Sequence, residues 1–251
     1  MNQGDRRSGQ PTPGQPTPEQ PSPGQPRRAF ASRPSGFSLI EMAMVLAALT
    51  LILSGVITPL GHYIDKQRTT RTHNELDAAH DALMGYAVSN GASLPCPDHD
   101  GDGTSDVTAG PIPCRVQEGY LPSATLGVRG FDGWGRRLRY RPDNAFTEPG
   151  GLGNPPNTTS RLQVRNRAGV RLTVSDPHSS AAIVFSCGKN GIPDDDNRAK
   201  GVIRNCSQAD ASDSRYVQDV TTPDEFDDVL IWVSKNILLN RLVAAGLWPT
   251  R

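Results

Sequence analysis

Gly36-Phe37-Ser38-Leu39-Ile40-Glu41 opens the stretch that decides the fold, and an apolar run follows it to Ile57 without a second charge. Residues 37–57 number 21, and a helix rising about 1.5 Å per residue would span roughly 30 Å, the thickness of a bilayer core. A lone carboxylate in such a helix is costly and calls for a partner. The run therefore predicts a transmembrane helix over residues 37–57 in which Glu41 has a function.

This hexapeptide, followed by an apolar helix, resembles the cleavage site of type IV prepilins and type II secretion pseudopilins. In that family a membrane peptidase cuts after the glycine and methylates the new amino terminus. The resemblance implies cleavage between Gly36 and Phe37, N-methylation of Phe37 and a role in assembly for Glu41. The Glu41 carboxylate would pair with the new ammonium of its own or a neighbouring subunit, and this pair could fix the axial register of packed helices. An ordinary signal anchor with an incidental glutamate is the alternative.

Residues 1–36 form a Pro/Gln-rich leader that contains near-repeats such as Pro11-Thr-Pro-Gly-Gln15. The leader holds few apolar side chains, so it cannot bury enough surface to fold and is expected to be disordered. Its charge is +3, from five arginines less Asp5 and Glu19, which suits a cytoplasmic leader that is removed on maturation. The whole chain is neutral, so the remainder carries −3 and offers no basic footprint for nucleic acid.

Four cysteines lie in the part expected beyond the membrane: Cys96, Cys114, Cys187 and Cys206. An even count in an exported domain indicates disulfides. Pairing Cys96 with Cys114 and Cys187 with Cys206 is the simplest of three possibilities, and each bond would stabilise the fold by roughly 3 kcal/mol. Zinc is a competing interpretation, with Cys96, His99 and Cys114 as ligands, but this spacing fits no standard zinc finger.

The sequence predicts an α+β fold in which a long N-terminal helix, transmembrane in its first half, packs on an antiparallel β-sheet head with two disulfide-bracketed loops. Residues 58–91 continue the helix as the spine of the head, with apolar side chains at helical spacing. Residues 92–251 form the head, and a helix is expected from about residue 235 to 245. Most of the strand-like runs alternate apolar with charged residues, so one sheet face should pack on the helix and the other should meet water, whereas the run 229–233 is apolar throughout. These runs are 137–141, 161–165, 170–174, 181–186 and 229–233.

The resemblance to prepilin-type proteins extends into the head through short segments. They are Leu94–Asp98, Gly119–Pro122, Asp132-Gly-Trp-Gly135 leading to Tyr140, Gly188-Lys-Asn-Gly191 and Phe226-Asp-Asp-Val229. In pseudopilins a segment of the aspartate-x-tryptophan-glycine type leads into a strand that closes the sheet. Taken with the N-terminal motif, these segments imply a pilin-like fold for most of the mature chain.

The sharpest candidate for a metal site is the loop that carries Asp98, Asp100, Asp102 and Asp106. Oxygens at positions 1, 3, 5 and 9, with glycine at position 6, match the front of an EF-hand calcium loop. Position 12 is Ala109, where the bidentate glutamate should be, so a solvated acidic turn is the alternative. A second acidic run, residues 194–197, is interpreted as a solvated loop. The acids at residues 224–228 are interpreted as surface or capping residues.

The sequence contains no recognisable enzyme motif, and no cofactor is required, with calcium as a possible ligand. Trp134 and Trp232 are expected in the core rather than in a sugar-stacking platform. The resemblance implies a minor pilin or pseudopilin in the bacterial inner membrane, single-pass with a periplasmic head, or extracellular in an assembled pilus. Its partners would be other pilin or pseudopilin subunits, prepilin peptidase and an inner-membrane assembly platform. The alternative is a non-assembling, membrane-anchored periplasmic module that binds calcium or a surface.

Overall fold

The computed structural model describes residues 36–108, 113–148, 160–173, 180–194, 197, 206, 214–222 and 225–247. The side chains of residues 55–59 are not described. Apart from Gly36, the expected leader lies outside the described residues, as do Ala109, Asp195, Asp196 and Asp224. The chain divides into two compact units, residues 1–52 and residues 53–251.

Helix α1 (Leu39–Ser89) is 51 residues long and belongs to both units. Its C-terminal part, inside the second unit, carries the expected apolar stripe. Leu76, Ala79 and Leu83 on this stripe are buried in the main core, which confirms the helical periodicity. The helix ends at Ser89 because the chain then turns through Gly91, whose φ of +65° suits glycine.

The expected membrane span over residues 37–57 is wrong. Among the described residues, no helix combines the length and the apolar content that crossing a membrane requires. The predictions of a transmembrane first half of the helix and of a single-pass inner-membrane location are therefore wrong.

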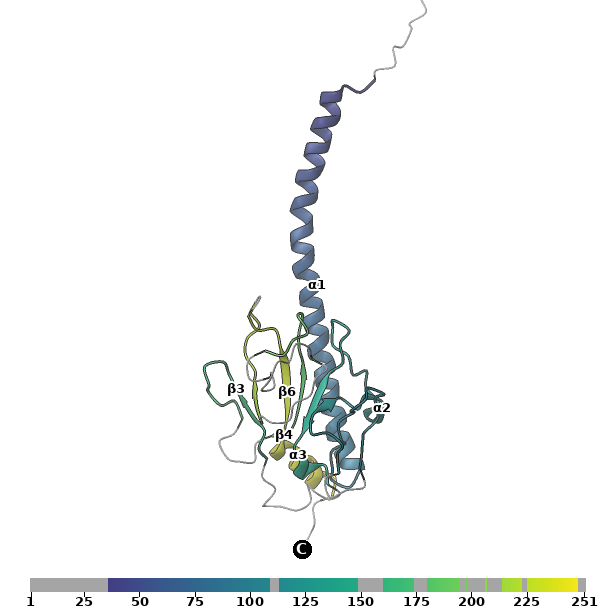
Figure 1. Cartoon of the computed structure of the whole chain (residues 1–251), viewed down its shortest axis with the longest axis vertical. Helices are drawn as coiled ribbons and strands as arrows, with labels where there is room; N and C mark the ends of the chain where they lie inside the picture. Colours follow the sequence, from purple (N-terminus) through teal and green to yellow (C-terminus); the bar gives the residue numbers. More distant parts are fainter. Residues whose placement is uncertain are drawn as a thin grey trace, which may run out of the picture. The chain divides into compact units, whose positions relative to one another are not determined.

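The main sheet is antiparallel and four-stranded, in the order β1-β2-β4-β6. Its strands are β1 (Gly119–Tyr120), β2 (Arg139–Pro142), β4 (Ser180–Ser186) and β6 (Val229–Ser234). The central pair β2 and β4 is in register from Arg139 opposite Phe185 to Pro142 opposite Ala182. Figure 1 shows β4 and β6 beside the C-terminal part of α1, so the molecule is α+β.

A second, two-stranded sheet pairs β3 (Gln163–Arg165) with β5 (Arg215–Val217) in parallel. A turn follows β3 at residues 166–170, where Gly169 N–H donates to the Asn166 carbonyl and Asn166 N–H donates to the Val170 carbonyl. The run expected as a strand at residues 170–174 contributes one bridge, between Arg165 and Arg171, and residue 174 lies outside the described part. Instead of a hairpin partner, β3 therefore pairs with a strand about 50 residues later, which the sequence analysis did not predict.

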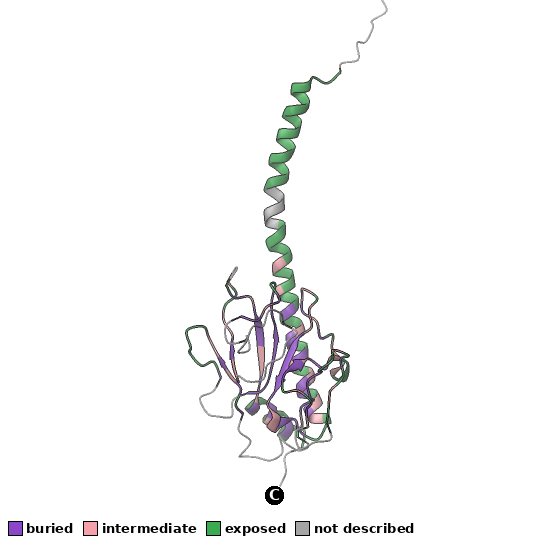
Figure 2. Cartoon of the chain, viewed as in Figure 1, coloured by how far each residue is buried: buried purple, intermediate pink, exposed green. Residues whose placement is uncertain are grey.

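Both faces of the main sheet are covered, so the expectation that one face meets water is wrong (Figure 2). Ala182 and Val184 point into the core that contains α1, whereas Ile183 and Phe185 belong to a second core that includes Val164 of β3 and Tyr216 of β5. Consequently β4 is buried at every position.

The alternating arginines of β2 lie in the covered face rather than in water. Arg139 is 1% exposed, and its Nη2 donates to Glu118 over 3.2 Å. The other Glu118 oxygen accepts the Tyr216 hydroxyl at 2.6 Å. A buried arginine is tolerated only when it is paired, and here the pairing joins the two sheets.

The remaining elements close the head. The short helix α2 (Ser123–Leu126) and the 3-10 turn η1 (Asn144–Phe146) precede and follow β2. Helix α3 (Lys235–Ala244) starts directly after β6 and buries Leu238 and Leu242 in the main core. Both expected disulfides are present, Cys96–Cys114 and Cys187–Cys206, which removes the proposed zinc ligands Cys96 and Cys114.

Replacing Gly133 with any larger residue should strongly destabilise the fold. A Cβ there would lie 2.0 Å from the Arg68 carbonyl oxygen of α1, so backbone must move. We expect Gly133→Ala to lower the free energy of unfolding by about 1–3 kcal/mol or more. Gly85→Ala is the matched control, because it lies in α1 with open space and should gain up to about 1 kcal/mol. Urea unfolding measures both, and an unchanged Gly133→Ala midpoint would contradict the packing.

Candidate functional site

The carboxylate of Asp132 organises the segment that enters β2. Asp132 is 1% exposed, and its Oδ1 accepts the backbone N–H groups of Trp134 and Arg136 at 2.9 and 2.8 Å. Its Oδ2 accepts the Ser186 hydroxyl at the end of β4, over 2.7 Å. The Ser186 oxygen in turn accepts the Gly188 N–H. One carboxylate therefore holds two of the short segments noted in the sequence, residues 132–135 and 188–191.

The third segment, residues 226–229, packs directly against the second. A Cβ on Gly188 would lie 2.1 Å from the Asp227 carbonyl oxygen, so only glycine permits this approach. Asn190 N–H donates to Asp227 Oδ2 over 2.7 Å. The Arg136 guanidinium donates to the carbonyls of Gly188 and Lys189 and so connects the first segment to the second. Three segments that are far apart in the sequence thus meet at one place in the head.

Three aspartates gather at this place: carboxylate oxygens of Asp194, Asp227 and Asp228 all lie within 4.8 Å of one another. Asp194 N–H donates to Asp228 Oδ2, and Asp227 N–H donates to Asp194 Oδ2. The Asn197 amide bridges Asp228 Oδ2 and the Val217 carbonyl of β5. We call Asp194, Asp227 and Asp228 the buried acidic cluster.

The electrostatics of the buried acidic cluster are unfavourable for three ionised carboxylates. Desolvation is the main cause that raises the pKa of Asp228 well above its usual range, and desolvation likewise raises the pKa of Asp227. The nearby Asp194 carboxylate adds to both shifts. Within the described residues, Oδ1 of Asp227 and Oδ1 of Asp228 are buried without a hydrogen-bond partner. Such oxygens are stabilised by a proton or by a cation.

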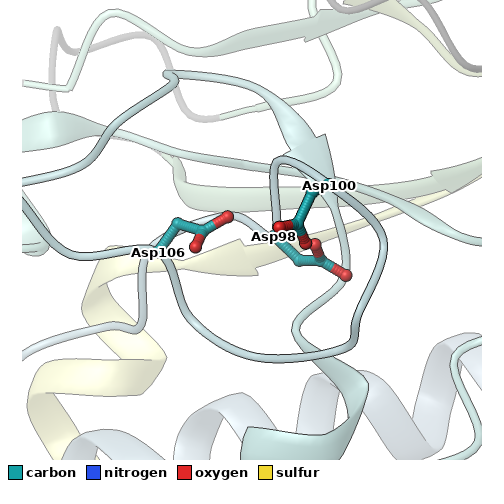
Figure 3. Close-up of side chains that lie close together, drawn as sticks. All are labelled: Asp98, Asp100 and Asp106. Atoms are coloured by element: carbon teal, nitrogen blue, oxygen red, sulfur yellow. The ribbon is translucent and has the colours of Figure 1, made fainter.

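The loop predicted as a calcium site brings together three of its four aspartates. Oxygens of Asp98, Asp100 and Asp106 lie within 4.8 Å of one another, and Figure 3 shows the three side chains gathered at the loop. Asp102 is not part of this group. Its Oδ1 accepts the backbone N–H and the hydroxyl of Thr104 at 2.7 Å each, and these bonds lower its pKa.

Most of the loop's carboxylates already accept hydrogen bonds from backbone N–H groups of the same loop. Asp98 is fully buried, and its two oxygens accept Gly101 N–H and Gly103 N–H at 2.6 and 2.8 Å. Asp106 Oδ2 accepts His99 N–H at 2.6 Å. These bonds satisfy the aspartates that hold the loop together, as side chains do in Asx turns. The arrangement can therefore be stable without a metal.

The sequence analysis did not identify the buried acidic cluster. Asp194 was interpreted as part of a solvated loop, and Asp227 and Asp228 were interpreted as surface or capping residues. Two signals were available: Asp194 lies inside the Cys187–Cys206 bracket, and Asp227-Asp228 directly precedes an apolar strand. Neither signal shows that these segments meet, because their separation of more than 30 residues is bridged only in the folded chain.

The residues expected to direct processing and assembly lie in the first unit. Residues 36–38 precede α1 in non-helical conformation and are exposed. Phe37 is 77% exposed, and no atom lies within 4 Å of the Cβ that Gly36 lacks. Glu41 is exposed in the first turn of α1, where the helix dipole favours a negative charge. Comparison of the chain with family models, curated proteins and solved structures gave no match.

Asp228→Asn should raise stability at neutral and alkaline pH. Burial raises the pKa of the Asp228 carboxyl in the folded chain. The protonated carboxyl is therefore compatible with folding at low pH, and this advantage is lost as the pH rises through the folded-state pKa. In EDTA at pH 8 we expect Asp228→Asn to raise the free energy of unfolding by about 1–3 kcal/mol. Each kcal/mol corresponds to a rise of roughly 2–4 °C in Tm. The gain should vanish as the pH falls toward the unfolded value of 3.8.

Thermal unfolding between pH 4 and pH 8 tests this expectation, with the exposed Asp77→Asn as the control for loss of one carboxylate. A variant Asp228→Asn that is less stable than the native chain at pH 8 in EDTA would contradict it.

Proposed function

We propose that this chain is a subunit of a helical filament of the pilin and pseudopilin kind, assembled through the N-terminal part of α1. The observation that carries the proposal is the exposure of that helix. Every large apolar side chain from residue 37 to residue 53 is exposed. These are Phe37, Leu39, Ile40, Met42, Met44, Val45, Leu46, Leu49, Leu51, Ile52 and Leu53.

A helix that is apolar on all sides is stable only when something covers it. Equivalent helices of neighbouring subunits offer a cover of the same chemistry, because apolar side chains interdigitate between parallel helices. The small residues Ala43, Ala47 and Ala48 lie among the large ones and would let helices approach closely. The head would then remain available for contacts with other components of the machinery.

Processing fits the same proposal. Residues 36–38 form an exposed, non-helical segment just before the helix, so the backbone at the expected cleavage site is accessible to a peptidase. Cleavage after Gly36 by prepilin peptidase would leave an ammonium on Phe37, four residues before Glu41. When helices pack, the Glu41 carboxylate would be buried, and a buried charge requires a partner. The N-terminal ammonium of the same or a neighbouring subunit is that partner.

Glu41→Ala should abolish incorporation into filaments without preventing cleavage. Removing one partner of a buried ion pair costs about 3–5 kcal/mol, so incorporation should fall by at least about 100-fold. The measurement is the fraction of subunit in sheared filaments when the variant is expressed with its processing and assembly components. Asp77→Ala, an exposed acid later in α1, is the matched control.

Mass spectrometry of the same material should give Phe37 as the methylated first residue in both variants. Either of two results would contradict the proposal: filaments that contain Glu41→Ala at the native level, or native subunits that retain the residues before Phe37.

We propose cation binding by the buried acidic cluster as a second function. The observation that favours it is the lone Oδ1 of Asp228, on a residue that is 1% exposed and faces two further carboxylates. Calcium takes six to eight oxygens at 2.3–2.6 Å, and three carboxylates with nearby backbone carbonyls supply that chemistry. Bound calcium would neutralise the mutual repulsion of Asp194, Asp227 and Asp228. The proposal assigns calcium to the buried acidic cluster, in the C-terminal half of the head, instead of the loop at residues 98–106 that the sequence suggested.

Calcium at a hundred times its Kd should stabilise the native chain by about 2.7 kcal/mol, or roughly 5–10 °C in Tm. Asp228→Asn should lose this stabilisation, because it removes the negative charge of the carboxylate whose Oδ1 has no hydrogen-bond partner. Asp100→Asn, in the other acidic loop, should keep it. A calcium response that survives Asp228→Asn and disappears in Asp100→Asn would place calcium at the first loop and contradict the proposal.

A further inference from the structure

A groove of about 630 Å³ follows one side of α1 within the second unit. Its lining comes from residues 63–74 of the helix and from Gly133 in the turn before β2. The charged residues of the described lining are Lys66, Arg68 and Arg71, and it contains no carboxylate. We call it the basic groove. Neither the packing of the N-terminal part of α1 nor the proposed cation site makes use of it.

The cations of the basic groove are accessible, and their charge is largely uncompensated. Lys66 and Arg71 are exposed, and neither forms an ion pair within the described residues. Arg68 lies 4.0 Å from Oδ1 of Asp65, but the Lys189 ammonium holds the other oxygen of that carboxylate at 2.7 Å. Ammonium and guanidinium groups only donate hydrogen bonds. The groove therefore fits a partner that carries anionic acceptors.

The loop at residues 98–106 has the opposite charge. It contains four aspartates and no lysine or arginine. Two of them, Asp98 and Asp106, hold the loop backbone as described above. The other two, Asp100 and Asp102, are exposed. The fold of the loop thus keeps two carboxylates at the surface of the head.

The exposed carboxylates of this loop remain available for a partner. Oδ1 of Asp100 accepts the Asp102 N–H over 3.2 Å, and Oδ1 of Asp102 accepts from Thr104. Within the described part of the chain, Oδ2 of neither residue takes part in a hydrogen bond or an ion pair. The bonds from Thr104 lower the pKa of Asp102, and the nearby Arg137 contributes least to that shift. Both carboxylates are therefore charged at neutral pH.

The basic groove and the 98–106 loop lie at different heights along α1. The groove follows residues 63–74, whereas Ser105 and Val107 share a smaller cavity with Tyr86. Tyr86 follows Arg71 by 15 residues, which corresponds to about 22 Å along a helix. Among the described residues, no ion pair joins the loop to the groove of the same chain. A second chain that is displaced along α1 can bring its loop to the groove.

We propose that the basic groove of one subunit binds the 98–106 loop of a neighbouring copy of this chain. This inference rests on the proposed filament and adds a contact between heads to it. The contact joins two different surfaces, so every subunit offers both and the contact can repeat without closing, as a helical filament requires. The opposite charges fix the register of the heads, with neighbours displaced by roughly 20 Å along α1.

Cysteine cross-linking of filaments made from the full chain tests which surfaces meet. The four native cysteines are all in disulfides, so introduced cysteines supply the only free thiols. Mild oxidation of filaments that carry Arg71→Cys and Asp100→Cys in one chain should give a ladder of covalent multimers. Neither substitution alone should give a ladder, because the contact joins unlike surfaces. Arg71→Cys combined with Asp77→Cys is the matched control and should give none.

Charge reversal tests whether the partner is a copy of the same chain. Arg71→Glu and Asp100→Arg should each lower incorporation into sheared filaments by about tenfold, because each places like charges opposite each other. Both changes in one chain should restore incorporation to within about threefold of the native level, because the charges are then exchanged. Arg161→Glu, an exposed arginine outside the groove, is the matched control. Thermal unfolding confirms that the variants fold.

Two results would overturn this inference while native filaments leave the proposed function standing. One is the absence of a ladder from the chain with both Arg71→Cys and Asp100→Cys. The other is a pair of single charge reversals that impair assembly without recovery in the combined variant, because the groove and the loop would then bind partners other than this chain. A native chain that forms no filaments would overturn the proposed function, and this contact with it.

Discussion

The buried carboxylate of Asp132 is the constraint on which the functional part of the head depends. Its oxygens bind two backbone N–H groups of the turn before β2 and the hydroxyl of Ser186 at the end of β4. Because a buried carboxylate must be fully bonded, this arrangement is costly to change. The residues that it holds lie beside two close backbone contacts, Gly133 against α1 and Gly188 against Asp227 of the buried acidic cluster.

A second buried acid, Glu118, connects the two sheets of the head. Glu118 accepts from Arg139 of the main sheet and from Tyr216 of the small sheet. Burial raises the pKa of the Tyr216 hydroxyl well above its usual range, with the Glu118 charge as the next cause, so the phenol keeps its proton and donates it. A buried ion pair adds little net stability, but it fixes where the small sheet docks.

The two acidic clusters show how pattern and burial can disagree. Residues 98–106 have the spacing of a calcium loop, yet in the folded head Asp98 and Asp106 accept backbone N–H groups and Asp102 turns to Thr104. Asp194 and Asp228 have no recognisable spacing. Even so, the fold buries them with Asp227 and leaves two carboxylate oxygens without partners. Burial, which raises the free energy of an unpaired charge, distinguishes a candidate cation site from a well-bonded turn.

Sequence alone indicated most of the elements and the presence of disulfides: the apolar spacing of α1, the runs that became β2, β4 and β6, and the final helix, whereas the structure selected one of three cysteine pairings. These follow from local periodicity and from the even cysteine count. Only the tertiary structure decided that β3 pairs with β5, that Arg139 lies inside, and that Trp134, Asn190 and Asp227 share one cavity. The physical reason is that such contacts join residues far apart in the chain, where periodicity carries no information on which surfaces meet or on how deeply a charge is buried.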